Sequence, residues 1–142
     1  MIDPASTVAP PKDPSVTRGV LRESSDGKIV LSIPGTDYRL HLVTKGGVSA
    51  PVGEKVEGRI MAQARRIDVI KSGGLYIEPI EGRPRRVQGR VIGVDEAADC
   101  VIVSAGVPVC CKTDGRQKPS DFKVDQMVTM DVLPGAVFKP ED

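Results

Sequence analysis

The sequence predicts an all-β protein made of two small five-stranded units in tandem. Short runs rich in Val, Ile and Leu recur along the 142 residues, and 15 Gly and 12 Pro separate them. No stretch has the 3.6-residue apolar period of a helix of any length. The order of strands and glycines in the first half also returns in the second half, offset by 61 to 72 residues.

The predicted strands of the first unit follow a proline-rich tail. Residues 1–15 contain four prolines and few apolar side chains, which predicts a disordered or extended segment. Strands are then expected at 16–23, 29–33, 38–43, 55–70 and 75–80. In the fourth of these, the apolar positions are even as far as Ala64 and odd at Ile67 and Val69. This change of phase predicts a bulge or bend at residues 65–66.

The second unit repeats these elements in the same order. The matched segments are 18–21 with 88–91, 28–32 with 100–104, 55–56 with 123–124, 74–79 with 135–140, and Gly35 with Gly106. A shared order and spacing of this kind is typical of a tandem duplication. We therefore expect one barrel at residues 16–80 and a second at 85–140.

Five short strands in a unit of about 60 residues, with a glycine in the first strand, resemble the Greek-key barrel of the OB type. Closure is expected because five short strands in an open sheet would leave two adhesive edges. The resemblance implies a binding module, since OB barrels commonly bind oligonucleotides across their second and third strands. Residues 69–72 also resemble the final strand of tandem molybdate-binding barrels, which makes a small-oxyanion-binding barrel a further alternative. The Ser-x-Arg-Asn motif of those barrels has no match on the first strand of either unit.

Positive charge gathers in the middle of a chain whose net charge is only +1. Residues 55–90 hold nine basic and four acidic side chains, whereas residues 91–142 hold five and nine. Arginine's planar fork suits phosphate oxygens. The candidate residues for binding nucleic acid or another polyanion are Arg59, Arg65, Arg66, Arg83, Arg85, Arg86 and Arg90. A polar outer strand face, or the bracing of the joint between the barrels, explains the same arginines without a ligand.

No catalytic, cofactor or metal site can be assembled from the sequence. His41 is the only histidine, and strand alternation is expected to turn it toward solvent. Cys100, Cys110 and Cys111 lack zinc spacing and are expected to be small buried hydrophobes. A hairpin turn at residues 105–106 would place Cys100 opposite Cys111.

Further expectations concern the core and the joint. Phe122 and Phe138 are expected in the core. Asp68 is expected to pair with Arg83, Arg85 or Arg86 and so to brace the barrel joint.

The expected function is that of a non-enzymatic binding module that contacts nucleic acid or another polyanion. The alternative is a protein-interaction or structural adaptor that uses exposed strand edges or the groove at the joint. No membrane partner is expected, because no apolar run approaches the length of a spanning helix. The odd cysteine count and the absence of a secretory signal favour the cytoplasm.

Overall fold

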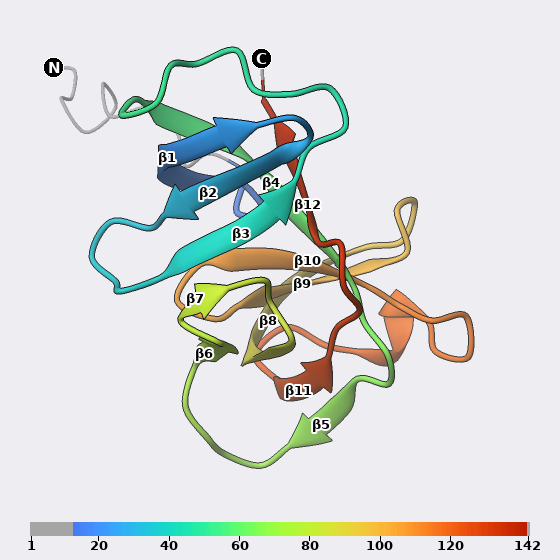
Figure 1. The fold of residues 1–142 in the computed structure, drawn as a ribbon. Helices are drawn as coiled ribbons and strands as arrows, with labels where there is room; N and C mark the ends of the chain where they lie inside the picture. Colours follow the sequence, from blue (N-terminus) through green and yellow to red (C-terminus); the bar gives the residue numbers. More distant parts are fainter. Residues whose placement is uncertain (1–12, 142) are drawn as a thin grey trace, which may run out of the picture.

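The computed structural model describes residues 13–141, so residues 1–12 of the tail predicted for residues 1–15 lie outside the described residues. The regular secondary structure of the described chain consists of β-strands and one 3-10 helix, η1 (Pro119–Asp121) (Figure 1). The strands are β1 (Thr17–Ser25), β2 (Lys28–Ser32), β3 (Arg39–Val43), β4 (Lys55–Gln63), β5 (Asp68–Ile70), β6 (Tyr76–Glu78), β7 (Glu81–Gly82), β8 (Arg86–Asp95), β9 (Cys100–Ser104), β10 (Pro108–Lys112), β11 (Met127–Asp131) and β12 (Val137–Pro140). The prediction of an all-β protein is confirmed.

Five of these strands close into one mixed barrel in the order β1, β2, β3, β12, β4 and back to β1. The neighbours are antiparallel except β3 and β12, which run parallel and meet at a single residue pair, Val43 and Val137. In Figure 1 the red C-terminal strand β12 lies beside β4. The C-terminal end of the described chain therefore completes a barrel that the N-terminal half begins.

The sequence predicts two barrels, and the structure shows one barrel with seven strands outside it. Residues 135–140 are expected to end a second barrel, but β12 occupies the closing position of the first. The segment expected to close the first barrel forms β6, which pairs with β8 so that Tyr76 lies opposite Gln88. A short strand can pair with the edge of either half of the sheet, so its local sequence does not decide whether it closes the barrel or pairs with β8.

β4 connects the barrel to the outer strands through β10, and β3 does so through β7. β8 pairs with β9, β11 and β6. β9 pairs in turn with β10, and β11 pairs with the edge strand β5. The end of β4 leaves the barrel and runs parallel to β10, with Met61 opposite Cys110, and Ala64 then bridges to Val132. β4 is thus shared between the barrel and the second half.

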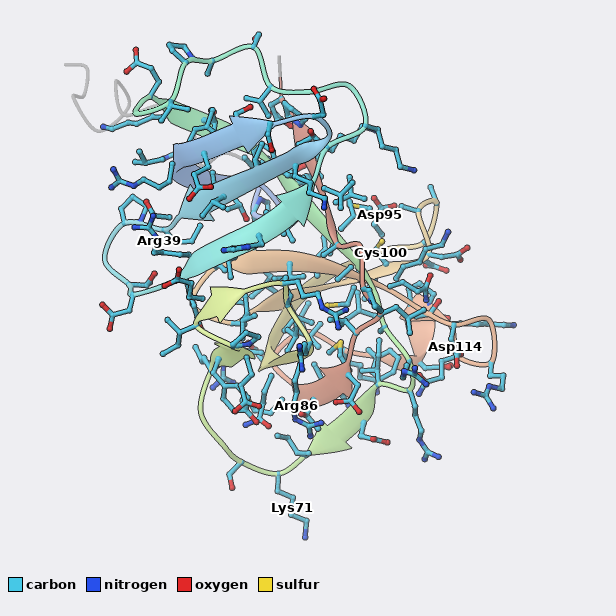
Figure 2. The ribbon with its side chains drawn as sticks, viewed as in Figure 1. Arg39, Lys71, Arg86, Asp95, Cys100 and Asp114 are labelled. Carbon is cyan, nitrogen blue, oxygen red and sulfur yellow. The ribbon has the colours of Figure 1, made fainter. Side chains whose placement is uncertain are left out.

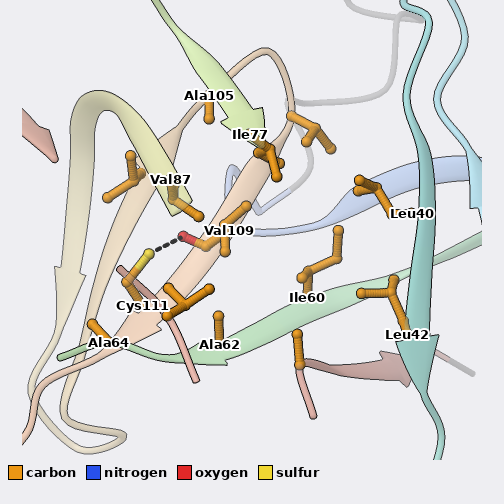
Figure 3. Packing of buried hydrophobic residues seen from close by; sticks show 14 of the residues in the cluster. Leu40, Leu42, Ile60, Ala62, Ala64, Ile77, Val87, Ala105, Val109 and Cys111 are labelled. Carbon is orange, nitrogen blue, oxygen red and sulfur yellow. Dashed lines mark hydrogen bonds between the residues drawn. The ribbon is translucent and has the colours of Figure 1, made fainter. Parts of the chain in front are cut away.

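One continuous core fills both parts. Leu40 and Ile60 of the barrel belong to the same buried cluster as Val87 and Val109 beyond it (Figure 3). Phe138 is fully buried in this cluster, and Phe122 is buried at its margin, so the prediction for both phenylalanines is confirmed. Because the core is not divided, we expect the described chain to unfold as one cooperative unit.

The predicted bend after Ala64 marks the end of β4. Even positions of β4 are buried as far as Ala64, and the next buried apolar residue is Ile67, as predicted. The side-chain amide of Gln117 holds this break, because the Ile67 N–H donates to Oε1 and Nε2 donates to the Ile67 carbonyl, both at 2.8 Å. The prediction is wrong at Val69, which lies exposed on the edge strand β5.

Several irregularities occur at corresponding places in the two halves. β1 has a register shift between Leu21 and Glu23, and β8 has one between Val91 and Gly93. Residues with positive φ also correspond, namely Gly27 with Asp99, Gly35 with Gly106 and Gly53 with Asp125. One proposed match is wrong, because the strand register places Met127, and not Lys123, where Lys55 lies in the first half.

Candidate functional site

The seven candidate arginines do not form one patch. Arg83 lines one groove, Arg65 and Arg66 line two neighbouring hollows, and Arg85 lines another with Arg86, which is labelled in the lower half of Figure 2. Four of the candidates already have partners within the protein, which are described first. Arg65, Arg83 and Arg85 form no ion pair within residues 13–141.

Arg59 of β4 binds residues from both ends of the described chain. Its guanidinium forms an ion pair with Asp13 and a longer one, 3.6 Å, with Glu141, and its Nε donates to Ser15 Oγ at 2.8 Å. Hydrogen bonds from Ser15, and then from Arg59, lower the pKa of Asp13 to about 2. The predicted tail extends to residue 15, but Ser15 is buried in this cluster. We therefore assign Arg59 a structural role.

Arg66 and Arg86 are also paired with carboxylates. Arg66 Nε lies 2.8 Å from Asp68 Oδ1, and both side chains are more than half exposed. The expectation that Asp68 pairs with an arginine of the joint is therefore wrong, because the break after β4 places Arg66 beside it. Arg86 Nη1 lies 2.7 Å from Asp131 Oδ1, and hydrogen bonds with Tyr76 and then Asp131 raise the pKa of Arg86.

The outer face of β8 is polar, as strand alternation predicts. Arg86, Gln88 and Arg90 alternate with residues that are buried. Tyr76 donates its hydroxyl to Gln88 Oε1 at 3.0 Å, and Arg90 Nη1 donates to the Asp125 carbonyl at 3.1 Å. Contacts within the protein thus account for this row of side chains.

One candidate site is a groove of about 410 Å³ on the outside of the barrel, where β3 meets β12. We call it the seam groove. It is lined by Glu23, Ser25, Lys28, Ile29, Val30, His41, Leu42, Val43, Arg83, Gly135 and Ala136. About half of its lining residues are apolar, and its charged groups are the cations Lys28 and Arg83 and the carboxylate of Glu23.

Strand register explains which side chains reach the seam groove. Val30 lies opposite both Glu23 and His41, and Lys28 lies opposite Val43, so two rows of outward residues cross β2 and β3. His41 is exposed, which confirms that it faces outward.

Arg83 reaches the seam groove through β7, which pairs in parallel with the start of β3 and places Gly82 opposite Leu40. Lys28 and His41 were not among the site residues predicted from sequence. Positive charge density singled out the arginines, and these two residues lie outside the basic segment.

A second site, which we call the arginine hollow, lies where β4 leaves the barrel. Its volume is about 520 Å³, and its lining residues are Gln63, Ala64, Arg65, Thr113, Asp114, Arg116 and Leu133. A smaller hollow beside it shares Asp114 and Arg116 and adds Arg66 and Gln117. The structure therefore brings Arg65 and Arg66 together with Arg116, which was overlooked because it lies in the acidic part of the sequence.

Arg85 lies in a more acidic setting. It shares a hollow of about 660 Å³ with Arg86, Glu78 and Asp131. Its backbone also joins two strands, because its N–H donates to the Glu78 carbonyl and its carbonyl accepts from the Val132 N–H. Two carboxylates beside two arginines leave little net charge for an anionic ligand.

The three cysteines are free thiols, and all are buried as predicted. Their predicted register is wrong by one residue, since Cys100 lies opposite Lys112 and Cys111 lies opposite Val101. Cys111 therefore faces the main core, where its thiol contacts the Val109 carbonyl (Figure 3). Cys100 and Cys110 belong to a small apolar cluster on the opposite face. The predicted Cys100–Cys111 juxtaposition does not occur.

Native thiols are expected to react very slowly with alkylating reagents. Burial raises the pKa of Cys100 to about 11 and that of Cys110 to about 12, and it raises the pKa of Cys111 still further. At pH 8 a thiol with the Cys100 pKa is about one part in a thousand thiolate. Iodoacetamide labelling followed by mass spectrometry should therefore modify the unfolded protein at three sites and leave the native protein unmodified over the same time. Rapid native labelling of Cys111 would contradict this assignment.

No protein-family model matches the chain, and comparison with curated proteins and solved structures finds no significant similarity. Residues 13–141 contain no group of three side chains with metal-binding potential. Within that range there is also no helix long and apolar enough to cross a membrane. The functional proposal therefore depends on the geometry of the barrel and its grooves.

Proposed function

We propose that the protein is a non-enzymatic binding module of the OB type and that single-stranded nucleic acid binds in the seam groove. The observation that carries this proposal is the position of the groove. It lies on the outer face of the second and third strands of a closed five-stranded barrel, with Arg83 and Lys28 in its wall. OB barrels use the same face for oligonucleotides and oligosaccharides.

Two features of the barrel support the OB type. It has five short strands of mixed direction, and its weakest joint is the single residue pair between β3 and β12. OB barrels are likewise five-stranded and partly open. The seam groove lies at this weak joint, where Val43 and Ala136 are bonded through their backbones at 2.9 Å.

The second half has features that support a duplicated OB-like unit. β8, β9, β10 and β11 repeat the pairing of the first four strands, including the register shift in the first of them. The end of β4 lies parallel to β10 and bridges to Val132 just after β11, which is the place of a fifth strand. We infer that the two units exchanged their closing strands, β12 for the end of β4.

The chemistry of the seam groove suits a phosphate-linked strand better than a protein surface. Arg83 and Lys28 can contact phosphate oxygens, while Val30 and Val43 provide apolar surface for a base or sugar. Tyr38 of the barrel cannot serve as a stacking platform for bases, because its side chain is buried. Its hydroxyl donates to the Ala105 carbonyl and accepts from the Ile77 N–H. We therefore expect binding that depends mainly on phosphate contacts and falls steeply with salt.

Replacing Arg83 with glutamine should weaken binding and reduce its salt dependence. Loss of one phosphate contact on a single strand should reduce the slope of log K against log salt by about 0.7. The measurement is fluorescence anisotropy of labelled oligo(dT) and oligo(U), about 16 nucleotides long, titrated at several salt concentrations.

Arg18→Gln is the matched control, because it removes the same charge from an exposed ion pair with Glu57 outside the seam groove. Absence of binding to either oligonucleotide at low salt would exclude the proposed function. Equal effects of the two substitutions would also contradict it, since Arg83 would then act only through net charge.

One observation favours a protein-interaction adaptor as the second candidate. β5 is the edge strand of the sheet path, with β11 as its neighbour, and it exposes about half of Val69. An unpaired strand edge with an apolar side chain can accept a strand from another protein. A protein that binds no polyanion at low salt and loses a protein partner on Val69→Lys substitution would support this function instead.

A further inference from the structure

We infer that the ligand is a linear polyanion long enough to occupy the seam groove and the arginine hollow together. This inference rests on the proposed function and extends it from a single groove to a path. The path would start beside Lys28 and Arg83, cross the connection between β11 and β12, and end beside Arg65 and Arg116. A mononucleotide or a free phosphate could occupy only one end of it.

One short piece of chain contributes residues to both sites. Gly135 and Ala136 line the seam groove, and Leu133 lines the arginine hollow. Consecutive Cα atoms are 3.8 Å apart, so Leu133 and Gly135 lie within about 7 Å of each other. A distance of this size is comparable to the spacing between neighbouring phosphates of a nucleic-acid strand, so a polymer can pass from one site to the other without a long gap.

The cations at the far end of the path are available to a ligand. Arg65 is exposed and forms no ion pair within residues 13–141. Arg116 is paired at 3.1 Å with Asp114, only two residues away, and its side chain is 87% exposed. The Asp114 side chain is 18% exposed, but the exposed guanidinium can turn to a phosphate, and an ion pair with one exposed partner contributes little to stability.

The nearby carboxylate does not exclude an anion. Asp114 Oδ1 accepts the backbone N–H of Arg116 at 3.0 Å, and its Oδ2 accepts from the guanidinium. These bonds lower the pKa of Asp114. The backbone bond does not involve the guanidinium, so it can still hold the carboxylate toward its own loop when a phosphate binds Arg116. Arg65 remains as a cation in the lining of the hollow.

Backbone hydrogen bonds hold the walls of the arginine hollow in place. Ala64 N–H donates to the Lys112 carbonyl, Arg65 N–H to the Asp131 carbonyl, and Leu133 N–H to the Gln63 carbonyl, at 2.8 to 2.9 Å. Gln117 fixes the following loop to Ile67. The arginines therefore project from a rigid support, which reduces the entropy lost on binding.

The test compares two lengths of ligand on the full chain. Labelled oligo(dT) of about 4 and about 16 nucleotides spans the range of site sizes known for OB folds. Substituting both Arg65→Gln and Arg116→Gln should leave binding of the short oligonucleotide unchanged. Binding of the long one should weaken, with a salt slope smaller by about 1.4, as expected for two lost phosphate contacts. Arg83→Gln should weaken binding of both lengths.

The outcomes separate this inference from the proposed function. If Arg83→Gln weakens binding but the double substitution changes neither length, the path is excluded and the seam groove remains. If the double substitution weakens both lengths equally, the hollow is itself the primary site and the path is again excluded. If none of the three arginines affects binding, both proposals fail. Arg18→Gln serves as the charge control, and thermal melting of each variant shows that it is folded.

Discussion

Phe138→Ala should lower the free energy of unfolding by about 3 to 5 kcal/mol, the usual cost of removing a fully buried phenylalanine. Phe138 lies in β12 opposite Ile60 of β4, with no exposed surface. The tip of its ring lies against Gly58, where a Cβ would lie only 2.6 Å from Cζ. The substitution therefore leaves a cavity where the closing strand β12 packs against β4. Chemical denaturation followed by circular dichroism measures the effect.

The undivided core adds a second expectation to this experiment. Phe138 is a neighbour of residues from both halves in one buried cluster, so hydrogen exchange in β2 and in β9 should accelerate together. Val124→Ala is a suitable control, because Val124 is more than half exposed and should cost less than about 0.5 kcal/mol. Faster exchange limited to the barrel, with β9 unaffected, would show that the two halves unfold independently.

Gly89→Ala should destabilise the protein by about 3 kcal/mol, the upper end of the usual cost of overpacking. A Cβ on Gly89 would overlap the Ser104 carbonyl oxygen and lie 2.7 Å from the Ser104 carbonyl carbon. These are backbone atoms of the paired strand β9, so β8 and β9 would have to separate. Thermal and denaturant unfolding of the variant measure the loss.

The first half provides a matched comparison. Gly19 occupies the corresponding place in β1, where a Cβ would lie 2.6 Å from Leu31 Cγ and 2.9 Å from the Ser32 carbonyl oxygen. Gly19→Ala should cost less than Gly89→Ala, because the backbone oxygen that its Cβ meets lies 2.9 Å away, whereas the Ser104 oxygen would overlap a Cβ on Gly89. Gly46→Ala should be nearly neutral, since a Cβ there meets no atom within 4 Å. A Gly89 variant as stable as the Gly46 variant would contradict the close approach of β8 and β9.

The candidate site was only partly predictable from sequence. Charge density identified Arg83 and Arg65, which the structure places in two grooves. It also identified Arg59 and Arg86, which are engaged in ion pairs with Asp13 and Asp131. A count of charges cannot distinguish these two groups, because an ion pair between residues far apart in the chain leaves no local pattern.

The sequence by itself determined the class of fold and the position of most strands. Alternation of apolar residues predicted the buried positions of β4 and the outward direction of His41, because side chains on a strand must alternate between its two faces. It also showed glycines at the places where strands approach closely, as at Gly19 and Gly89. These properties are local, so a short segment carries them.

Only the tertiary structure decided which strand closes the barrel. β6 and β12 both follow a glycine-containing turn and have similar lengths and apolar content, yet β6 pairs with β8 and β12 pairs with β3 and β4. Ile77 of β6 and Phe138 of β12 are both buried in the core that the two halves share, so the burial of either residue does not depend on local sequence alone. The position of β12 also brings Gly135 into the wall of the seam groove, two residues after Leu133 of the arginine hollow. Such a choice minimises the free energy of the whole chain, and no single segment encodes it.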